Sequence, residues 1–290
     1  MVTPVALPAK VICIGNATVG GTGKTQVAIW LAKKLIARGV KPVILCKGYG
    51  GAFAYPTVVD SSMEAVIVGD EALELCEYAT TIIAKKPTDA VPLLGKLLPD
   101  VIIVDDGMQN PSFIKDFIIM VVDGKRGFGN RMLFPAGPMR QSVESSLKMA
   151  DGVVVTHYEG EDSEMITRGA KVYKATISIE SLGSPTRQPP QEAESCKYYA
   201  FTGIGNPERF FALCESRLGN LVATKAFPDH HKYLEAEIAE LIQEASKLDA
   251  KLITTRKDYV KLKGRKDIRP LNVTLEIEDG DKLVDSSLLN

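Results

Sequence analysis

The chain has 290 residues, of which 45% are apolar and 24% are charged, an ordinary globular composition that allows one large domain or two smaller ones. Its formal net charge of -1 leaves no general basic field, so nucleic acid is not expected as a partner. The five cysteines stand singly without a CxxC pair, and no stretch approaches the roughly 18 apolar residues of a membrane helix, which argues against a disulfide framework, a zinc site and a membrane span.

The first half of the chain alternates short apolar runs with helical patterns. Continuous apolar strands separated by crossover helices predict an α/β fold with a mostly parallel sheet covered by helices on both faces. Ligands then belong at the carboxyl ends of the strands. The predicted strands are residues 11–14, 42–46, 81–84, 101–104, 117–122 and 152–156, and the predicted helices are residues 24–38, 71–79, 88–97 and 141–149.

A change of composition marks residues 181–194, which are rich in Pro, Ser and Gln and read as a linker. A second, smaller α/β pattern follows it. We therefore expect a first domain over residues 1–180, a linker over 181–194 and a smaller domain over 195–290. In the second domain the predicted strands are residues 197–201, 221–226, 251–255 and 271–277, and the predicted helices are residues 207–215 and 234–248.

The most informative motif is KVICIGNATVGGTGKT over residues 10–25, where a predicted strand runs into a glycine-rich loop and then a helix. Successive backbone N–H groups of such a P-loop surround a polyphosphate, Lys24 reaches the β/γ oxygens and the Thr25 hydroxyl binds Mg²⁺. The strict pattern has glycine where this chain has Thr18. We expect ATP or GTP to be bound by Thr18, Val19, Gly20, Gly21, Thr22, Gly23, Lys24 and Thr25. The first domain is thus predicted to be P-loop NTPase-like, and the second to close over its active site.

Two pairs of acids could assist that chemistry. Asp105 and Asp106 end an apolar run, where a carboxylate beside the P-loop strand can hold Mg²⁺ or its water shell. Asp70 and Glu71 open a predicted helix and allow two interpretations. Acids favour a helix N-terminus in any protein, but one acid here could take a proton from an acceptor hydroxyl while the other helps to hold the metal. The residues alone favour neither interpretation.

Two of the three histidines, His230 and His231, follow Asp229 in a predicted loop of the second domain. Missing partner ligands disfavour a metal site. We favour a histidine hydrogen-bonded to a catalytic carboxylate, provided that the second domain closes over the first. Residues 125–140 mix arginines with apolar side chains, which suits a substrate with phosphate and hydrocarbon, or an ordered loop packed on the core.

These motifs, in this order, resemble the tetraacyldisaccharide 4'-kinase family, the lipid A biosynthesis kinases of Gram-negative bacteria. The resemblance covers roughly residues 10–260 and rests on GNATVGGTGKT, KGYGG, VGDE, DDGMQ, VVDGKRGFGNRMLFPAGPMR, TGIGNPERFF, FPDHH and TTRKD. It implies transfer of the γ-phosphate of ATP, with Mg²⁺, to the 4'-hydroxyl of a tetraacylated glucosamine disaccharide 1-phosphate, giving lipid IVA. Thr18 agrees with the family's loop, T-x-G-G-x-G-K-T.

The resemblance also implies roles for single residues. Asp70 matches the catalytic base, with His230 as its partner, and Lys24 matches the nucleotide contact. The metal is assigned to Thr25, Glu71, Asp105 and Asp106, and the lipid substrate to Gln109 and Arg140.

Departures from the family pattern are lysine at position 47, asparagine at 110 and lysines at 85 and 86, in place of the usual arginine, histidine and arginine. The family usually begins with an N-terminal membrane helix, whereas this chain starts almost at the predicted P-loop strand. Because the substrate is an amphiphile, we still expect a cytoplasmic protein that contacts the cytoplasmic face of the inner membrane peripherally. No obligate protein partner is implied.

Two other classes of protein compete with a kinase. A nucleotide-switch ATPase of the partitioning or positioning type would carry a lysine at the start of the loop, in the pattern K-G-G-x-x-K, but Val19 precedes the two glycines here. A non-catalytic nucleotide-binding scaffold would leave the carboxylates and the histidine pair without a role.

Overall fold

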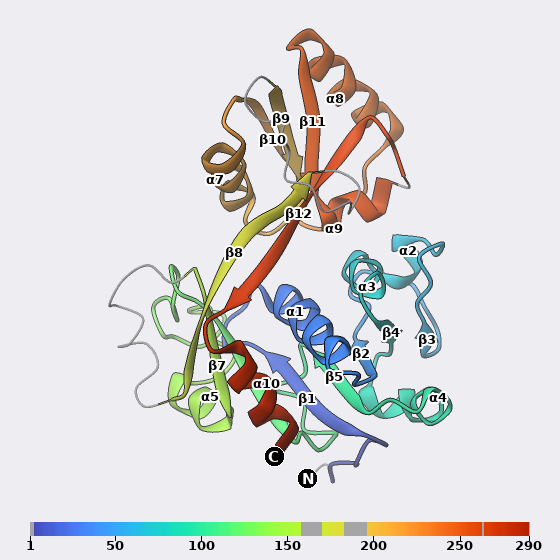
Figure 1. Ribbon diagram of the computed structural model, residues 1–290, viewed down its shortest axis with the longest axis vertical. Helices are drawn as coiled ribbons and strands as arrows, with labels where there is room; N and C mark the ends of the chain where they lie inside the picture. The colour runs from blue at the N-terminus through green and yellow to red at the C-terminus, as the bar shows by residue number, and fades with distance from the viewer. Residues whose placement is uncertain (1–2, 158–169, 183–195, 263, 290) are drawn as a thin grey trace.

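The computed structural model describes residues 3–157, 170–182, 196–262 and 264–289. Their strands form one sheet with the order β10-β9-β11-β12-β8-β7-β6-β1-β5-β2-β4-β3. Figure 1 shows two units joined by two long strands, β8 (Val172–Leu182) and β12 (Ile268–Ile277). The predicted α/β fold with a mostly parallel sheet is confirmed.

The first unit is built around β1 (Lys10–Gly15), which pairs in parallel with β5 (Val101–Asp105) and β6 (Phe117–Asp123). Parallel pairing aligns the carboxyl ends of these three strands at one edge of the sheet, where ligands of such sheets bind. Antiparallel pairs are found between β3 and β4 and between β8 and β12. The remaining strands of this unit are β2 (Pro42–Cys46), β3 (Thr57–Val58), β4 (Thr80–Ile83) and β7 (Gly152–Thr156).

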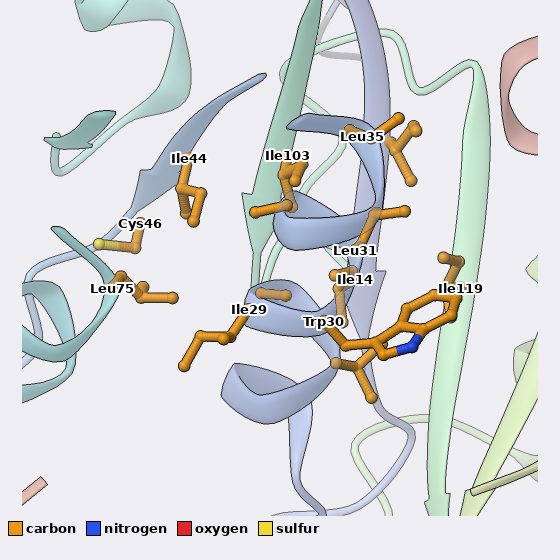
Figure 2. Close-up of a cluster of buried hydrophobic side chains, with 14 of the residues drawn as sticks. Ile14, Ile29, Trp30, Leu31, Leu35, Ile44, Cys46, Leu75, Ile103 and Ile119 are labelled. Carbon is orange, nitrogen blue, oxygen red and sulfur yellow. The ribbon is translucent and has the colours of Figure 1, made fainter. Parts of the chain in front are cut away.

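Helices cover both faces of this sheet because alternate residues of its central strand face opposite sides. Ile12 and Ile14 pack into a cluster with α1 (Lys24–Ala37), α3 (Asp70–Cys76) and α10 (Gly280–Leu289), part of which Figure 2 shows. Val11 and Cys13 pack instead with Leu94 of α4 (Val91–Leu97). The shorter helices α2 (Ala65–Val68), η1 (Pro87–Ala90) and α5 (Val143–Met149) lie in the connections.

The second unit is also a parallel sheet with helices on both faces, but it is smaller. Its strand β9 (Lys197–Thr202) lies in parallel between β10 (Leu221–Ala226) and β11 (Ala250–Thr255). Tyr198 packs on the side of α7 (Pro207–Leu218), whereas Tyr199 packs on the side of α8 (Glu235–Lys247). After β11 the chain forms α9 (Arg256–Tyr259) and η2 (Val260–Leu262), which return toward α3 (Figure 1).

Two elements depart from the sequence-based expectations. Strand β8 was not predicted, and its last two residues fall inside the predicted linker. Its residues are only partly buried because it runs between the units, so no continuous apolar run marks it. The rest of the linker, residues 183–194, lies outside the described residues.

Helix α10 is the second departure, since no helix was predicted over residues 280–289. The structure packs it on α1 of the first unit, where Lys10 donates to the Leu288 carbonyl at 2.6 Å. A Cβ atom on Gly280 would lie 2.5 Å from Cζ2 of Trp30, so the two helices approach closely there. Within the described ranges, no helix is long and apolar enough to cross a membrane.

Candidate active site

The glycine-rich loop leaves the carboxyl end of β1 and enters α1. Gly20 and Gly23 have φ angles of 100° and 91°, a left-handed region that glycine adopts at least cost. Asn16 Nδ2 donates to Thr22 Oγ1 at 3.2 Å, and Thr156 Oγ1 donates to the Thr22 carbonyl at 3.1 Å. The loop is therefore braced from within and from the end of β7, as a phosphate-binding loop needs to be.

Lys24, the first residue of α1, faces the acidic end of β5. Its Nζ lies 3.5 Å from Asp106 Oδ1, which also accepts a hydrogen bond from Arg140 Nη1 at 2.9 Å. Burial would raise the Asp106 pKa, but Lys24 and Arg140 together hold it below its usual value. Asp106 is thus an ionised counter-ion to both Lys24 and Arg140.

Asp105 and Thr25 form the part of the site that could hold a metal. Thr25 Oγ1 lies 3.5 Å from Asp105 Oδ2, while Asp105 Oδ1 is buried without a hydrogen-bond partner among the described residues. Burial, together with the charge of Glu71, raises the Asp105 pKa to about 7. A carboxylate with one oxygen near a hydroxyl and the other without a partner is a donor set that suits a hard cation such as Mg²⁺.

No group of three or more His, Cys, Asp or Glu side chains forms a ready metal cage in the part of the chain that the structure describes. This agrees with the way in which Mg²⁺ is usually held beside a nucleotide, by one or two protein oxygens, phosphates and water. The residues present therefore fit the metal that the motif implies.

Asp70 begins α3, and the backbone before it is tightly constrained. Gly69 has a φ angle of 89°, and a Cβ atom there would lie only 2.6 Å from the Tyr49 carbonyl oxygen. The KGYGG loop therefore packs directly against the turn that presents Asp70. The carboxylate is buried, and its Oδ1 accepts a hydrogen bond from the Glu71 amide at 2.9 Å.

His230 reaches Asp70 from the second unit, so the hydrogen bond expected between a histidine and this carboxylate is present. Its Nδ1 lies 3.0 Å from both Asp70 oxygens. This contact raises the His230 pKa, against the effect of burial. Burial also opposes ionisation of Asp70, but His230 and Lys257 hold the Asp70 pKa below its usual value. The two groups stabilise each other in their charged forms.

The other predicted residues lie in different surroundings. His231 Nε2 lies 2.9 Å from Glu237 Oε2 and its ring stacks on Phe227, so the adjacent histidines have separate partners. Gln109 donates to the Asn16 carbonyl at 2.7 Å and so braces the P-loop here. Val19 donates to the Pro138 carbonyl at 2.7 Å, which ties residues 125–140 to the same loop.

Sequence reasoning assigned no role to Lys257, which lies in the motif TTRKD, or to Lys261, which follows it. Lys257 Nζ lies 3.6 Å from Glu71 Oε1, 3.3 Å from Asp229 Oδ1 and 3.4 Å from His230 Nε2. Lys261 Nζ lies 3.7 Å from Asp70 Oδ2. These two lysines complete a charged network around Asp70 that local sequence patterns do not reveal.

A phosphate-binding loop, carboxylates at the next strand end and a histidine supplied by a second unit together define a P-loop nucleotide-binding enzyme of two α/β units. The family described as Tetraacyldisaccharide-1-P 4'-kinase matches residues 1–289, and the chain belongs to it. The nucleotide-switch alternative is therefore not favoured.

Individual relatives agree with this assignment. A tetraacyldisaccharide 4'-kinase of Rickettsia typhi is 45% identical over 283 residues, which cover 97% of this chain and 85% of the relative. Its counterpart in Rickettsia africae is 43% identical with the same coverage. A crystal structure of the "apo" form of LpxK from Aquifex aeolicus in complex with ATP is 25% identical, with a TM-score of 0.80 over 99% of this chain and 90% of that one.

Proposed function

We propose that this chain transfers the γ-phosphate of ATP to the 4'-hydroxyl of a tetraacyldisaccharide 1-phosphate, giving lipid IVA. The observation that carries the proposal, beside the family, is the Asp70–His230 contact made between the two units. A nucleotide-binding scaffold has no need of a buried carboxylate paired with histidine. A kinase does, because the acceptor hydroxyl must be oriented and must lose its proton.

The P-loop residues would bind ATP, with the loop amides and Lys24 on the β- and γ-phosphates. Lys24 then exchanges its contact with Asp106 for the phosphate, where it neutralises charge that develops on transfer. Thr25 and Asp105, with Glu71 and Asp106 nearby, would hold Mg²⁺. The metal, when bound, supplies further neutralisation of the phosphate oxygens.

Asp70 would receive the proton of the acceptor hydroxyl. As its oxygen bonds to the γ-phosphorus, the bond from that phosphorus to the β-bridging oxygen breaks and ADP leaves. The lowered pKa makes Asp70 a weak base, which suits a loose transition state in which the proton moves late and positioning matters most. His230 and Lys257 keep the carboxylate ionised and directed.

We also assign the lipid side of the site to residues 125–140, with Arg140 and Gln109 at their P-loop end. Met132, Leu133 and Phe134 are 53%, 54% and 70% exposed, beside the exposed Arg131. Apolar groups next to a cation suit an acylated phosphate and an anionic membrane surface. Peripheral contact with the cytoplasmic face of the inner membrane follows from this proposal.

The direct test is to mix the purified protein with ATP, Mg²⁺ and tetraacyldisaccharide 1-phosphate and to follow ADP and the bisphosphorylated lipid. Equal yields of both products are expected. ADP formed without phosphorylated lipid would contradict the assignment of the acceptor.

A further inference from the structure

Arg256 and Glu77 join the second unit to the end of α3 by a bidentate ion pair. Arg256 Nε and Nη2 lie 2.7 Å and 2.6 Å from the two carboxylate oxygens of Glu77. The side chains are only 19% and 26% exposed, and the Arg256 guanidinium lies 5.5 Å from the centre of the Tyr259 ring. A planar fork sets direction as well as distance, which a single lysine contact does not.

The two ends of this pair belong to the elements that carry the two halves of the site. Glu77 caps the C-terminus of α3, and the same helix begins with Asp70. Arg256 directly precedes Lys257, which lies 3.4 Å from His230 Nε2. The pair therefore lies about two helical turns from the Asp70–His230 contact, beyond the reacting groups.

The segment that carries Arg256 is held firmly to the loop that carries His230. Asp258 is fully buried, and its Oδ2 accepts from Thr202 Oγ1 at 2.7 Å and from the Gly203 amide at 2.9 Å. The Gly203 carbonyl in turn accepts from the His230 amide at 3.1 Å. A displacement of Arg256 can therefore reach His230 through the hydrogen bonds of Asp258 and Gly203.

We propose that Glu77 and Arg256 form a positioning pair that sets the angle of the second unit against α3, so that His230 meets Asp70. A second ion pair between the units, Arg209 Nη1 to Asp123 Oδ2 at 3.2 Å, joins α7 to the end of β6. Because this contact stays intact, loss of Arg256 tilts the second unit instead of detaching it. The rate of the reaction should respond, while the P-loop itself is unchanged.

Kinetics test the proposal first, and this readout rests on the proposed function. Arg256→Gln should lower kcat about 10-fold, since small displacements of catalytic groups are costly, and should leave the KM for ATP within about 2-fold. Glu77→Gln should behave alike, and the double variant should be no slower than either single one. If the loss of kcat in the double variant equalled the product of the two single losses, the residues would act separately and the proposal of a positioning pair would be overturned.

Arg38→Gln is the matched control. Arg38 Nη1 lies 2.5 Å from Asp285 Oδ1, an ion pair that also joins distant segments, α1 and α10, but away from the site. This variant should keep the wild-type kcat. If Arg38→Gln and Arg256→Gln lowered kcat equally, the loss would reflect a general loss of stability, and the proposal would be overturned.

A second readout needs no activity at all. The His230 pKa, followed by NMR, should fall in Arg256→Gln toward its ordinary value, because the Asp70 hydrogen bond that raises it weakens; Asp229 and Lys257 also face the ring. The signal is assigned by its loss in His230→Gln. Arg256→Lys, which keeps the charge but loses the fork, should shift the pKa in the same direction by less. An unchanged His230 titration in Arg256→Gln would overturn the proposal even if the lipid substrate proved to be different.

Discussion

His230 Nδ1 is equidistant, at 3.0 Å, from both oxygens of Asp70, a residue 160 positions earlier in the chain. The ring N–H of His230 is therefore within hydrogen-bond distance of both carboxylate oxygens. His230 thus contacts both oxygens, and the orientation of the carboxylate depends on how the second unit sits on α3. The position of the proposed base is therefore coupled to the arrangement of the two units through this contact.

Asp70→Asn should slow turnover about 10²–10⁴-fold while ATP still binds, because the amide cannot accept the hydroxyl proton. His230→Ala should also slow turnover, and the double variant should lose much less than the product of both effects. His231→Ala, whose side chain contacts Glu237 instead, is the control and should be milder. Single-turnover kinetics measure all four, and an active Asp70→Asn enzyme would remove Asp70 from the reaction.

Lys24→Ala should lower turnover about 10²–10³-fold through the loss of charge stabilisation at the transferred phosphate. The fold should persist, since Lys24 faces Asp106 at the end of the sheet and not the core. Lys34→Ala, on the same helix but paired with exposed Asp281, should have wild-type kinetics. Steady-state assays with circular dichroism as a folding control decide the matter, and wild-type turnover in a folded Lys24→Ala protein would refute the P-loop assignment.

Glu74 should make stability depend on pH. It is buried against Gln26, which donates to it at 3.0 Å, and burial raises its pKa from 4.5 to about 7. The folded state therefore holds this proton more tightly than the unfolded chain. Stability from this group is fully present below about pH 4.5 and is lost as the pH rises through about 7, with a limit of about 3 kcal/mol.

Glu74→Gln cannot ionise, so its free energy of unfolding should fall less than that of the wild type between about pH 5 and about pH 7.5. Urea titrations at both pH values measure this difference. Glu144→Gln, which removes an exposed acid on α5, is the control and should follow the wild type. Identical pH slopes for Glu74→Gln and the wild type would show that Glu74 titrates normally.

Gly69→Ala should both destabilise the protein and slow turnover. Its left-handed φ angle and the 2.6 Å approach to the Tyr49 carbonyl leave no room for a methyl group, so the turn before Asp70 must move. Gly95→Ala in the exposed part of α4 meets nothing within 4 Å and should be stabilising by up to about 1 kcal/mol. Thermal unfolding of both variants gives the comparison, and a Gly69→Ala protein with wild-type stability and rate would contradict this account of the turn.

Phe134→Ser should weaken binding to anionic vesicles, because its side chain is exposed on the proposed lipid-facing segment, which also carries the exposed Arg131. Val222→Ser removes a partly exposed apolar side chain from β10 of the second unit and should bind as the wild type does. Cosedimentation at low salt measures binding. If the wild type and Phe134→Ser sediment equally, residues 125–140 are not the membrane contact.

The central strands could be predicted because they are buried on both faces and read as continuous apolar runs. β5 is buried throughout, and β1 is buried except at Lys10. β8 escaped prediction because only scattered residues along it are buried, and its pairing with β12 joins segments far apart in the chain. Helix α10 was not predicted, and nothing local in the sequence indicates that it packs on α1.

For the site, the residues that motifs single out could be found from the sequence, and their roles stay predictions. Local patterns indicate the P-loop, Asp70 and His230, and the structure brings the last two together. Lys257 and Lys261 were missed because a lysine on a short helix looks like any solvated lysine. The role of each lysine depends on the carboxylate that it contacts, and these carboxylates, Glu71 and Asp70, lie on α3 in the other unit.

The packing of α10 on α1 has a consequence for biosynthesis. The P-loop helix is made early, yet the face that carries Trp30 stays without its cover until the ribosome has passed Gly280. The strands β9, β10 and β11 of the second unit lie closer together in the chain than α1 and α10 do, so the second unit can fold before α10 has packed on the first. The nascent chain should therefore acquire a stable nucleotide-binding unit only after α10 has emerged, and ATP added to stalled chains that end before Gly280 should protect them poorly from proteolysis.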